Sequence, residues 1–195
     1  MKPKQNSCTS PAQAAQATWR YSNVAILIHW TSALIIFAIA ALGWYMMSVE
    51  NEPGSGQYFA LHKSLGLVLA MLVATRLVWR LLHRPAPLPT TVPKWEVNLA
   101  RGVQWLMYVM MVLMPLSGFL GGSFSKYGVQ FFGLSLPHWF IPDPETAEKF
   151  FDIHSVLIWV LVALVTLHIL GALKHLLLDK DGTFQRMWFK CCKCS

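Results

Sequence analysis

The stretch FDIHSVLIWVLVALVTLHILGALKH, residues 151–175, decides the fold of this chain. Apart from Asp152 and Lys174 near its two ends, it carries no charged side chain. A helix rises about 1.5 Å per residue and a hydrocarbon core is about 30 Å thick, so the stretch is long enough to cross a membrane. His154, His168 and His175 interrupt it, and an ionisable side chain at such depth needs a partner.

The composition of the whole chain also indicates a membrane protein. Of its 195 residues, 55% are hydrophobic and 13% are charged, whereas about a quarter of a soluble domain is charged. Four segments are long enough to span the bilayer, at about 24–49, 59–79, 103–122 and 150–178. Because short joins favour antiparallel neighbours, the predicted fold class is an all-α membrane protein, a four-transmembrane-helix up-down bundle.

The segments between and within these spans carry further expectations. The four prolines of residues 84–94 favour an extended spacer. The longer join 123–149 is expected to lie across one mouth of the bundle with its aromatic side chains at headgroup depth. Pro115 is expected to kink the third span unless a neighbour satisfies the carbonyl that it frees.

The distribution of charge predicts the orientation in the membrane. The chain divides into a leader (1–23), a transmembrane domain (24–178) and a basic, cysteine-containing tail (179–195). The leader has no apolar core of the signal-peptide kind and is expected to remain. With the N-terminus cytoplasmic, thirteen of the 16 basic residues lie on the cytoplasmic side, so both termini are predicted to be cytoplasmic.

This topology accounts for the net charge of +7 and for the position of the cysteines. The net positive charge is explained by the excess of basic residues on the predicted cytoplasmic side, so it gives no support to nucleic-acid binding. All four cysteines fall in the two predicted cytoplasmic tails, where disulfides are rare. These residues are Cys8, Cys191, Cys192 and Cys194.

Four histidines are predicted to meet in pairs at two depths. His154 and His168 are 14 residues apart, which places them about 40° from the same helix face and about 21 Å apart along the axis. His29 lies at the depth of His168, in the inner half of the bundle. His62 lies at the depth of His154, in the outer half. The other histidines near the spans, His83 and His138, fall outside the apolar stretches, where solvation suffices.

A buried imidazole in a membrane span can be a contact between helices or a metal ligand. A single one is often a hydrogen-bonded contact between helices, but four at matched depths with no carboxylate beside them favour a metal partner. Zinc prefers four protein ligands, often thiolate or carboxylate. Haem iron needs only axial ligands, so one histidine from each of two helices is enough. The absence of a C-x-x-C-H motif then predicts a non-covalent, b-type haem.

Other residues could serve such a site. Gly43, Gly66 and Gly171 could make room for a flat ring, although small residues also let helices approach closely. His175, about 10 Å nearer the cytoplasm than His168, is expected to exchange a proton at a quinone, or else to be a solvated helix-end histidine. The candidate propionate or interface contacts, which are cationic, are Lys63, Lys126, Arg20, Arg76 and Arg80.

The sequence resembles the prokaryotic cytochrome b561 proteins. The resemblance rests on H-x-x-x-G with R-L-x-x-R in residues 62–80, and on LHILGALKH-x-x-x-D-x-D-G in residues 167–182, with further similarity in residues 20–30, 108–122 and 132–137. It implies a four-helix inner-membrane protein with two b haems, ligated by His29 with His168 and by His62 with His154. Some members of this family oxidise superoxide and reduce ubiquinone.

The leading interpretation is therefore a quinone-linked oxidoreductase, a dihaem cytochrome that carries electrons between an outer donor, a small anion such as superoxide or a protein, and the quinone pool. A membrane anchor that relays electrons for a dehydrogenase or hydrogenase is the second interpretation. A haem-free channel with a histidine proton path is the third, but the spans lack the acidic relay residues that it favours.

Overall fold

The structure is a computed structural model of the whole chain and describes residues 19–83, 86 and 92–189. The fold consists of four long helices: α2 (Asn23–Ser48), α3 (Gly56–Leu82), α4 (Lys94–Phe124) and α5 (Pro144–Lys174). All four are long and apolar enough to cross a membrane. The predicted fold class is confirmed.

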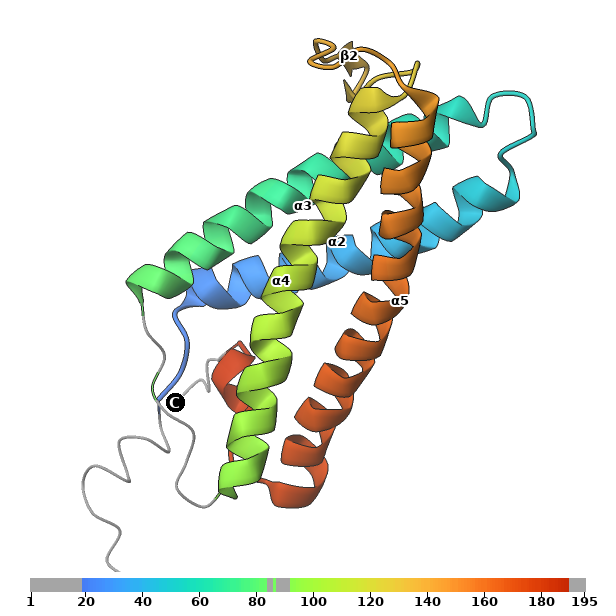
Figure 1. Cartoon of the computed structure of the whole chain (residues 1–195). Coiled ribbons are helices and arrows are strands. Elements are labelled where there is room, and N and C mark those ends of the chain that lie inside the picture. Colours follow the sequence, from blue (N-terminus) through green and yellow to red (C-terminus); the bar gives the residue numbers. More distant parts are fainter. Residues whose placement is uncertain (1–18, 84–85, 87–91, 190–195) are drawn as a thin grey trace, which may run out of the picture.

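The helices run up and down in sequence and form two pairs. Helix α4 packs along α5, α2 pairs with α3, and α3 joins the pairs through α4. The α2–α3 pair crosses the α4–α5 pair at a steep angle (Figure 1). We call the end with the start of α2 and the end of α5 the termini end, and the opposite one the hairpin end.

Apolar side chains hold the pairs together inside and cover the bundle outside. Leu69 and Val73 of α3 pack against Tyr108 and Met111 of α4. A second cluster joins α4 to Leu161 of α5. Many large apolar residues remain exposed along all four helices, which is the distribution expected of a surface that faces lipid.

Local signals set the ends of the helices. The Ser22 hydroxyl accepts a hydrogen bond from the amide of Ala25 and caps α2. Pro144 is the first residue of α5. Proline is tolerated there because the backbone N–H that it lacks would have no partner within the helix. Helix α5 continues into a π-helical turn, His175–Asp179, and the chain turns back at Lys180, which has a φ of 50°.

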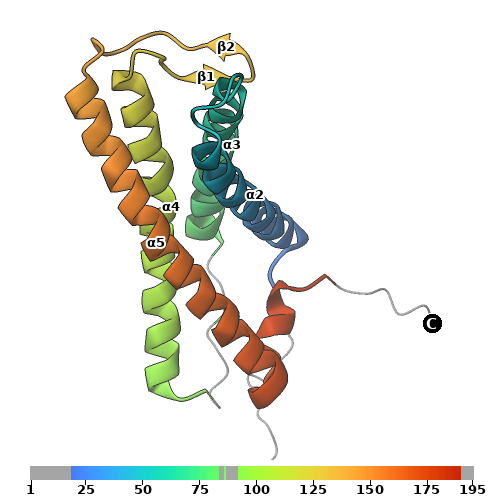
Figure 2. The ribbon, with the colours of Figure 1, turned by 90° about the vertical axis from the view of Figure 1, so that its right-hand side faces the viewer.

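A small hairpin covers one end of the bundle. Strands β1 (Gln130–Phe131) and β2 (Leu134–Ser135) pair antiparallel, and the hairpin lies beside the start of α3 (Figure 2). Phe132 and Gly133, with φ of 46° and 88°, form its two-residue turn. The Ser64 hydroxyl accepts from the amide of Phe132, and Lys63 Nζ donates to the Gly128 carbonyl at 2.8 Å.

Two expectations differ from the observed helices. The join 123–149 is shorter than predicted, because α5 begins at Pro144 and α4 extends to Phe124. Helix α4 continues through Pro115, so the kink expected there stays a prediction. It also begins at Lys94, nine residues before the predicted span, because an amphipathic first turn needs no hydrocarbon around it.

Some predicted features lie outside the described residues. These are most of the leader, most of the proline-rich spacer at 84–94, and all four cysteines. Of the predicted tail, the structure describes the part up to Phe189, including a short 3-10 helix, Phe184–Met187. This helix lies against α2, because the amide of Tyr21 donates to the Arg186 carbonyl and the Trp30 indole donates to the Met187 carbonyl.

Candidate functional site

Four histidines meet in two pairs inside the bundle. The ring centres of His29 on α2 and His168 on α5 are 6.2 Å apart, with an angle of 73° between the ring planes. The ring centres of His62 on α3 and His154 on α5 are also 6.2 Å apart, at 76°. The first pair lies toward the termini end and the second toward the hairpin end, the grouping that the depths in the sequence predicted.

The spacing within each pair fits one metal ion between two imidazoles. A metal–nitrogen bond of about 2 Å on each side places the two ring centres about 6 Å apart. Two histidines give only two ligands to each such ion. A haem, whose porphyrin fills four positions of its iron, needs no more than these two.

An unpaired nitrogen atom and close glycines also fit a bound group. Within the described ranges, Nδ1 of His29 is buried and has no hydrogen-bond partner, which is rare for a histidine that only packs. Nδ1 of His62 is also buried and makes no hydrogen bond of good geometry, with the backbone of Ile39 on α2 as its neighbour. A Cβ on Gly43 would lie 3.2 Å from the His62 ring, and one on Gly118 would lie 3.1 Å from the His154 ring. Helix α2 therefore leaves space for the His62 ring, and helix α4 leaves space for the His154 ring, because each helix has glycine at the point of contact.

The other glycines singled out in the sequence face open space. A Cβ on Gly66 or Gly171 would meet no atom within 4 Å. Both residues leave room beside a histidine, since Gly66 follows His62 by one turn and Gly171 follows His168 by three residues.

A cavity of about 300 Å³ lies at the termini end, between α2 and α3. Arg76, Arg80 and Tyr108 border it, together with Ile28, the neighbour of His29. Both guanidinium carbons lie over the Tyr108 ring, 5.9 Å and 5.8 Å from its centre. Arg80 donates to Gln104 at 2.9 Å. Two cations beside one cavity provide a place for the carboxylates of a ligand.

The remaining candidate cations are placed differently. Arg20 hydrogen-bonds the Trp188 carbonyl and so ties the start of α2 to the C-terminal segment. Lys63 is tied to the hairpin through Gly128, and Lys126 lies 5.0 Å over the Tyr127 ring at the same end. Only Lys63 follows directly on one of the four histidines.

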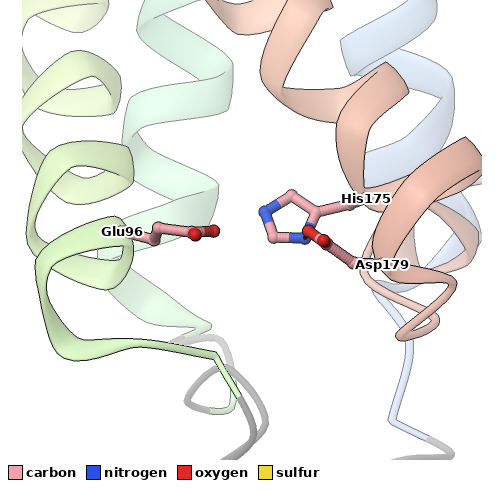
Figure 3. A group of neighbouring side chains, drawn as sticks. All are labelled: Glu96, His175 and Asp179. Carbon is pink, nitrogen blue, oxygen red and sulfur yellow. Dashed lines mark ion pairs between the residues drawn. The ribbon is translucent and has the colours of Figure 1, made fainter.

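The fifth candidate histidine, His175, belongs to a charged cluster at the end of α5 (Figure 3). Its Nδ1 lies 2.8 Å from Asp181 and 3.2 Å from Asp179. Glu96 of α4 points toward it from the facing helix. Lys174 bonds both Glu96 and Asp179 at 2.8 Å. Because Lys174 pairs with two of these carboxylates, the described contacts of the cluster form an ion-pair network.

Asp181 is held ionised in this cluster. Burial alone would raise its pKa, but the hydrogen bond from the backbone amide of Thr183 and the nearby His175 outweigh burial and lower the pKa below its ordinary value. The contribution of Asp181 to stability is therefore complete above the ordinary carboxyl pKa and is lost as the pH falls through the lowered one.

Replacement of Asp181 by asparagine should reveal this contribution. The variant keeps an acceptor for Thr183 but loses the charge beside His175, so we expect a loss of about 1 kcal/mol, or about 2–4 °C in Tm, at pH 7. The difference should shrink at acidic pH as Asp181 of the parent protein is protonated. Thermal unfolding followed by circular dichroism from pH 7 to 3 measures it. A difference independent of pH would contradict the assignment.

The sequence interpretation did not identify two features of the site. Ser117 and the Met114 carbonyl contact His154 from α4, 37 and 40 residues away in the chain, and no local motif marks them. Asp181, by contrast, belongs to the D-x-D-G motif in residues 179–182, so its pairing with His175 had a signal in the sequence.

Comparisons with known proteins give one family and several relatives. Residues 20–190 match the family described as prokaryotic cytochrome b561. Cytochrome b561 homolog 2 of Escherichia coli K12 is 31% identical over 171 residues, 86% of this chain and 90% of the relative. Homolog 1 of the same strain is 23% identical over 175 residues, 86% and 96% of the two chains. A probable superoxide oxidase, CybB of Yersinia pestis, is 28% identical over 179 residues, 86% and 95%.

Proposed function

Because the chain belongs to the prokaryotic cytochrome b561 family, a family of bacterial membrane electron-transfer proteins with b-type haem, we propose that it holds two b haems and carries electrons from a donor at the hairpin end to a quinone at the termini end. The proposal rests on one observation: the structure has two histidine pairs, and in each pair the ring centres are 6.2 Å apart. Two such pairs about 21 Å apart along α5 provide two relay points across one bilayer.

In this proposal His29 and His168 would hold one haem through its iron, and His62 and His154 would hold the other. Haem iron, when bound, accepts and releases one electron at a time. The residues of the chain orient the group and exclude water from it. Arg76 and Arg80 are the best-placed partners for the propionates at the termini end, since both border the cavity there. Lys63 is the nearest candidate at the hairpin end.

The proposed orientation places the termini end in the cytoplasm. The basic residues gather at that end, as the positive-inside rule expects of a cytoplasmic face. The hairpin end then faces the periplasm and would receive electrons there.

The donor side is proposed to accept a small anion. CybB of Yersinia pestis, a relative over 86% of this chain, is described as a probable superoxide oxidase. Lys63 and Lys126 place positive charge at the hairpin end. Because Glu145 and Glu148 lie at the same end, these lysines would attract an anion such as superoxide only in their immediate surroundings. Two superoxide ions would give up one electron each and leave as oxygen.

The quinone side is proposed to lie near His175. A quinone takes up two electrons and two protons to become a quinol, so its site needs a group that supplies protons from the cytoplasm. His175 is such a group. Its Nδ1 is paired with Asp181, which fixes the ring and leaves Nε2 for the quinone oxygen. Asp181 therefore acts as a positioning residue.

The function is tested with the purified holoprotein in liposomes that contain ubiquinone and no other electron acceptor. Superoxide generated outside by xanthine oxidase should reduce the haems and then the ubiquinone. We expect His175→Ala to keep full haem reduction and to slow quinol formation about tenfold or more, whereas His83→Ala, which removes an exposed histidine stacked on Trp79, should leave the rate unchanged.

Two results would contradict this function. Haem reduction by superoxide without any ubiquinone reduction would remove the quinone from the proposal and favour a relay subunit for a soluble partner. No haem reduction by superoxide, with normal reduction by dithionite, would remove superoxide as the donor.

A further inference from the structure

The His154 ring is tied to α4 through one of its two nitrogens. Nδ1 lies 3.0 Å from the Met114 carbonyl oxygen and 3.2 Å from the Ser117 hydroxyl. The Ser117 hydroxyl in turn donates to the Met114 carbonyl at 2.9 Å. Because a carbonyl only accepts, Nδ1 of His154 carries the hydrogen. Its Nε2 is then the nitrogen whose lone pair can bind a metal.

The same turn of α4 provides the surface on which the ring rests. A Cβ on Gly118 would lie 3.1 Å from Cε1 and 3.2 Å from Nδ1 of His154. The ring edge that carries Nδ1 therefore lies directly against the backbone of α4. We call the Met114 carbonyl, Ser117 and Gly118 the His154 seat. With Ser117 only 6% exposed, water does not compete for these hydrogen bonds.

The other buried rings are not supported in this way. Among the described residues, His29 has a buried Nδ1 without a hydrogen-bond partner. The buried Nδ1 of His62, across the same pair, makes no hydrogen bond of good geometry and has only the backbone of Ile39 beside it. An imidazole whose N–H is hydrogen-bonded is a stronger electron donor to a metal and keeps a fixed ring plane. The two histidine pairs have the same distance between ring centres. They differ because the pair at the hairpin end contains His154, whose Nδ1 is hydrogen-bonded to α4.

We propose that Ser117, together with the Met114 carbonyl, is a positioning residue for His154: it fixes the plane of this ring and strengthens Nε2 as a donor to the haem iron at the hairpin end. The inference rests on the proposed function, because it concerns a haem ligand. Stronger donation favours the ferric state. The centre at the hairpin end then has a lower reduction potential than an unsupported pair of imidazoles would give.

The test is Ser117→Ala in the full-length, purified holoprotein. Loss of one of the two acceptors of the Nδ1 hydrogen weakens donation by His154, so the reduction equilibrium of one centre should shift about threefold to tenfold toward the ferrous state, where tenfold is about 59 mV for one electron. The other centre should not change. Potentiometric titration measures the shift, and electron paramagnetic resonance of the ferric protein reports any rotation of the ring plane through its largest g value.

Ser123→Ala is the matched control. Ser123 is a buried serine of the same helix, 3% exposed, whose hydroxyl donates to the Phe119 carbonyl. We expect this variant to keep both potentials and both ferric signals. Ser117→Thr retains the hydroxyl and should restore the potential of the parent protein. These comparisons separate the contact with His154 from a general effect of removing a buried hydroxyl.

Three results would overturn the inference: an unchanged potential and ferric signal in haem-loaded Ser117→Ala, an equal shift of both centres, or the same shift in Ser123→Ala. A second measurement needs no substitution. In the reduced, ¹⁵N-histidine-labelled parent protein, one axial ligand should have an Nδ1 resonance displaced by hydrogen bonding, and equivalent Nδ1 resonances for all axial ligands would also overturn it. A parent protein without haem would instead refute the proposed function.

Discussion

Replacement of any one of His29, His168, His62 or His154 by alanine is expected to reduce the b-haem content from two per chain to about one. In the proposed function each ring would provide one of the two protein ligands of its centre, and the partner imidazole alone would leave the iron without its second ligand. His29→Ala and His168→Ala should remove the same centre, because their rings face each other. His62→Ala and His154→Ala should remove the other.

The reduced-minus-oxidised spectrum and the haem content of each purified variant measure this effect. The controls are His138→Ala and His175→Ala, whose side chains lie outside the two pairs, beside Gly128 and Asp181. Both should retain two haems. The pairing would be contradicted if His29→Ala and His168→Ala removed different spectral components, or if either control lost a centre.

A second large effect is expected from Gly118→Val. The Cβ alone would lie 3.1 Å from the His154 ring, and the two methyl groups of valine would occupy the space of the ring itself. His154 must then leave its position opposite His62. We expect loss of the centre at the hairpin end, with the other centre retained, because volume added to a packed interior moves its neighbours.

Gly102→Val is the control for this substitution. Gly102 lies on the same helix, and a Cβ there would meet no atom within 4 Å. The control should keep both haems, so that the cost of a β-branched residue in α4 is separated from the clash with His154. Retention of both haems in Gly118→Val, with an unchanged spectrum, would contradict the position of the His154 ring against α4.

The fold followed from the sequence because hydropathy and helix geometry are both nearly independent of the rest of the structure. Four apolar stretches of sufficient length predict four spanning helices. The ends were less certain, since a hydropathy window stops at the first charges whereas the helix continues into the interface. Glu96 in the first turn of α4 and Glu145 in that of α5 lie on such extensions.

The meeting of the histidines was predictable for a similar reason. The rise per residue fixes the depth of each ring, and the up-down order decides which depths coincide. The contacts around each ring were not predictable in this way. Whether Ser117 or another residue of α4 faces His154 depends on the rotation of α4 about its axis, which side-chain packing sets.

The count of haems on the purified, unaltered protein tests the central claim most directly. It is made by the pyridine haemochrome method, with a protein concentration from amino-acid analysis. Two histidine pairs of equal spacing predict about two b haems per chain. A value near zero would contradict the claim entirely and would return the four histidines to packing between helices, and a value near one would show that one of the two pairs holds no haem.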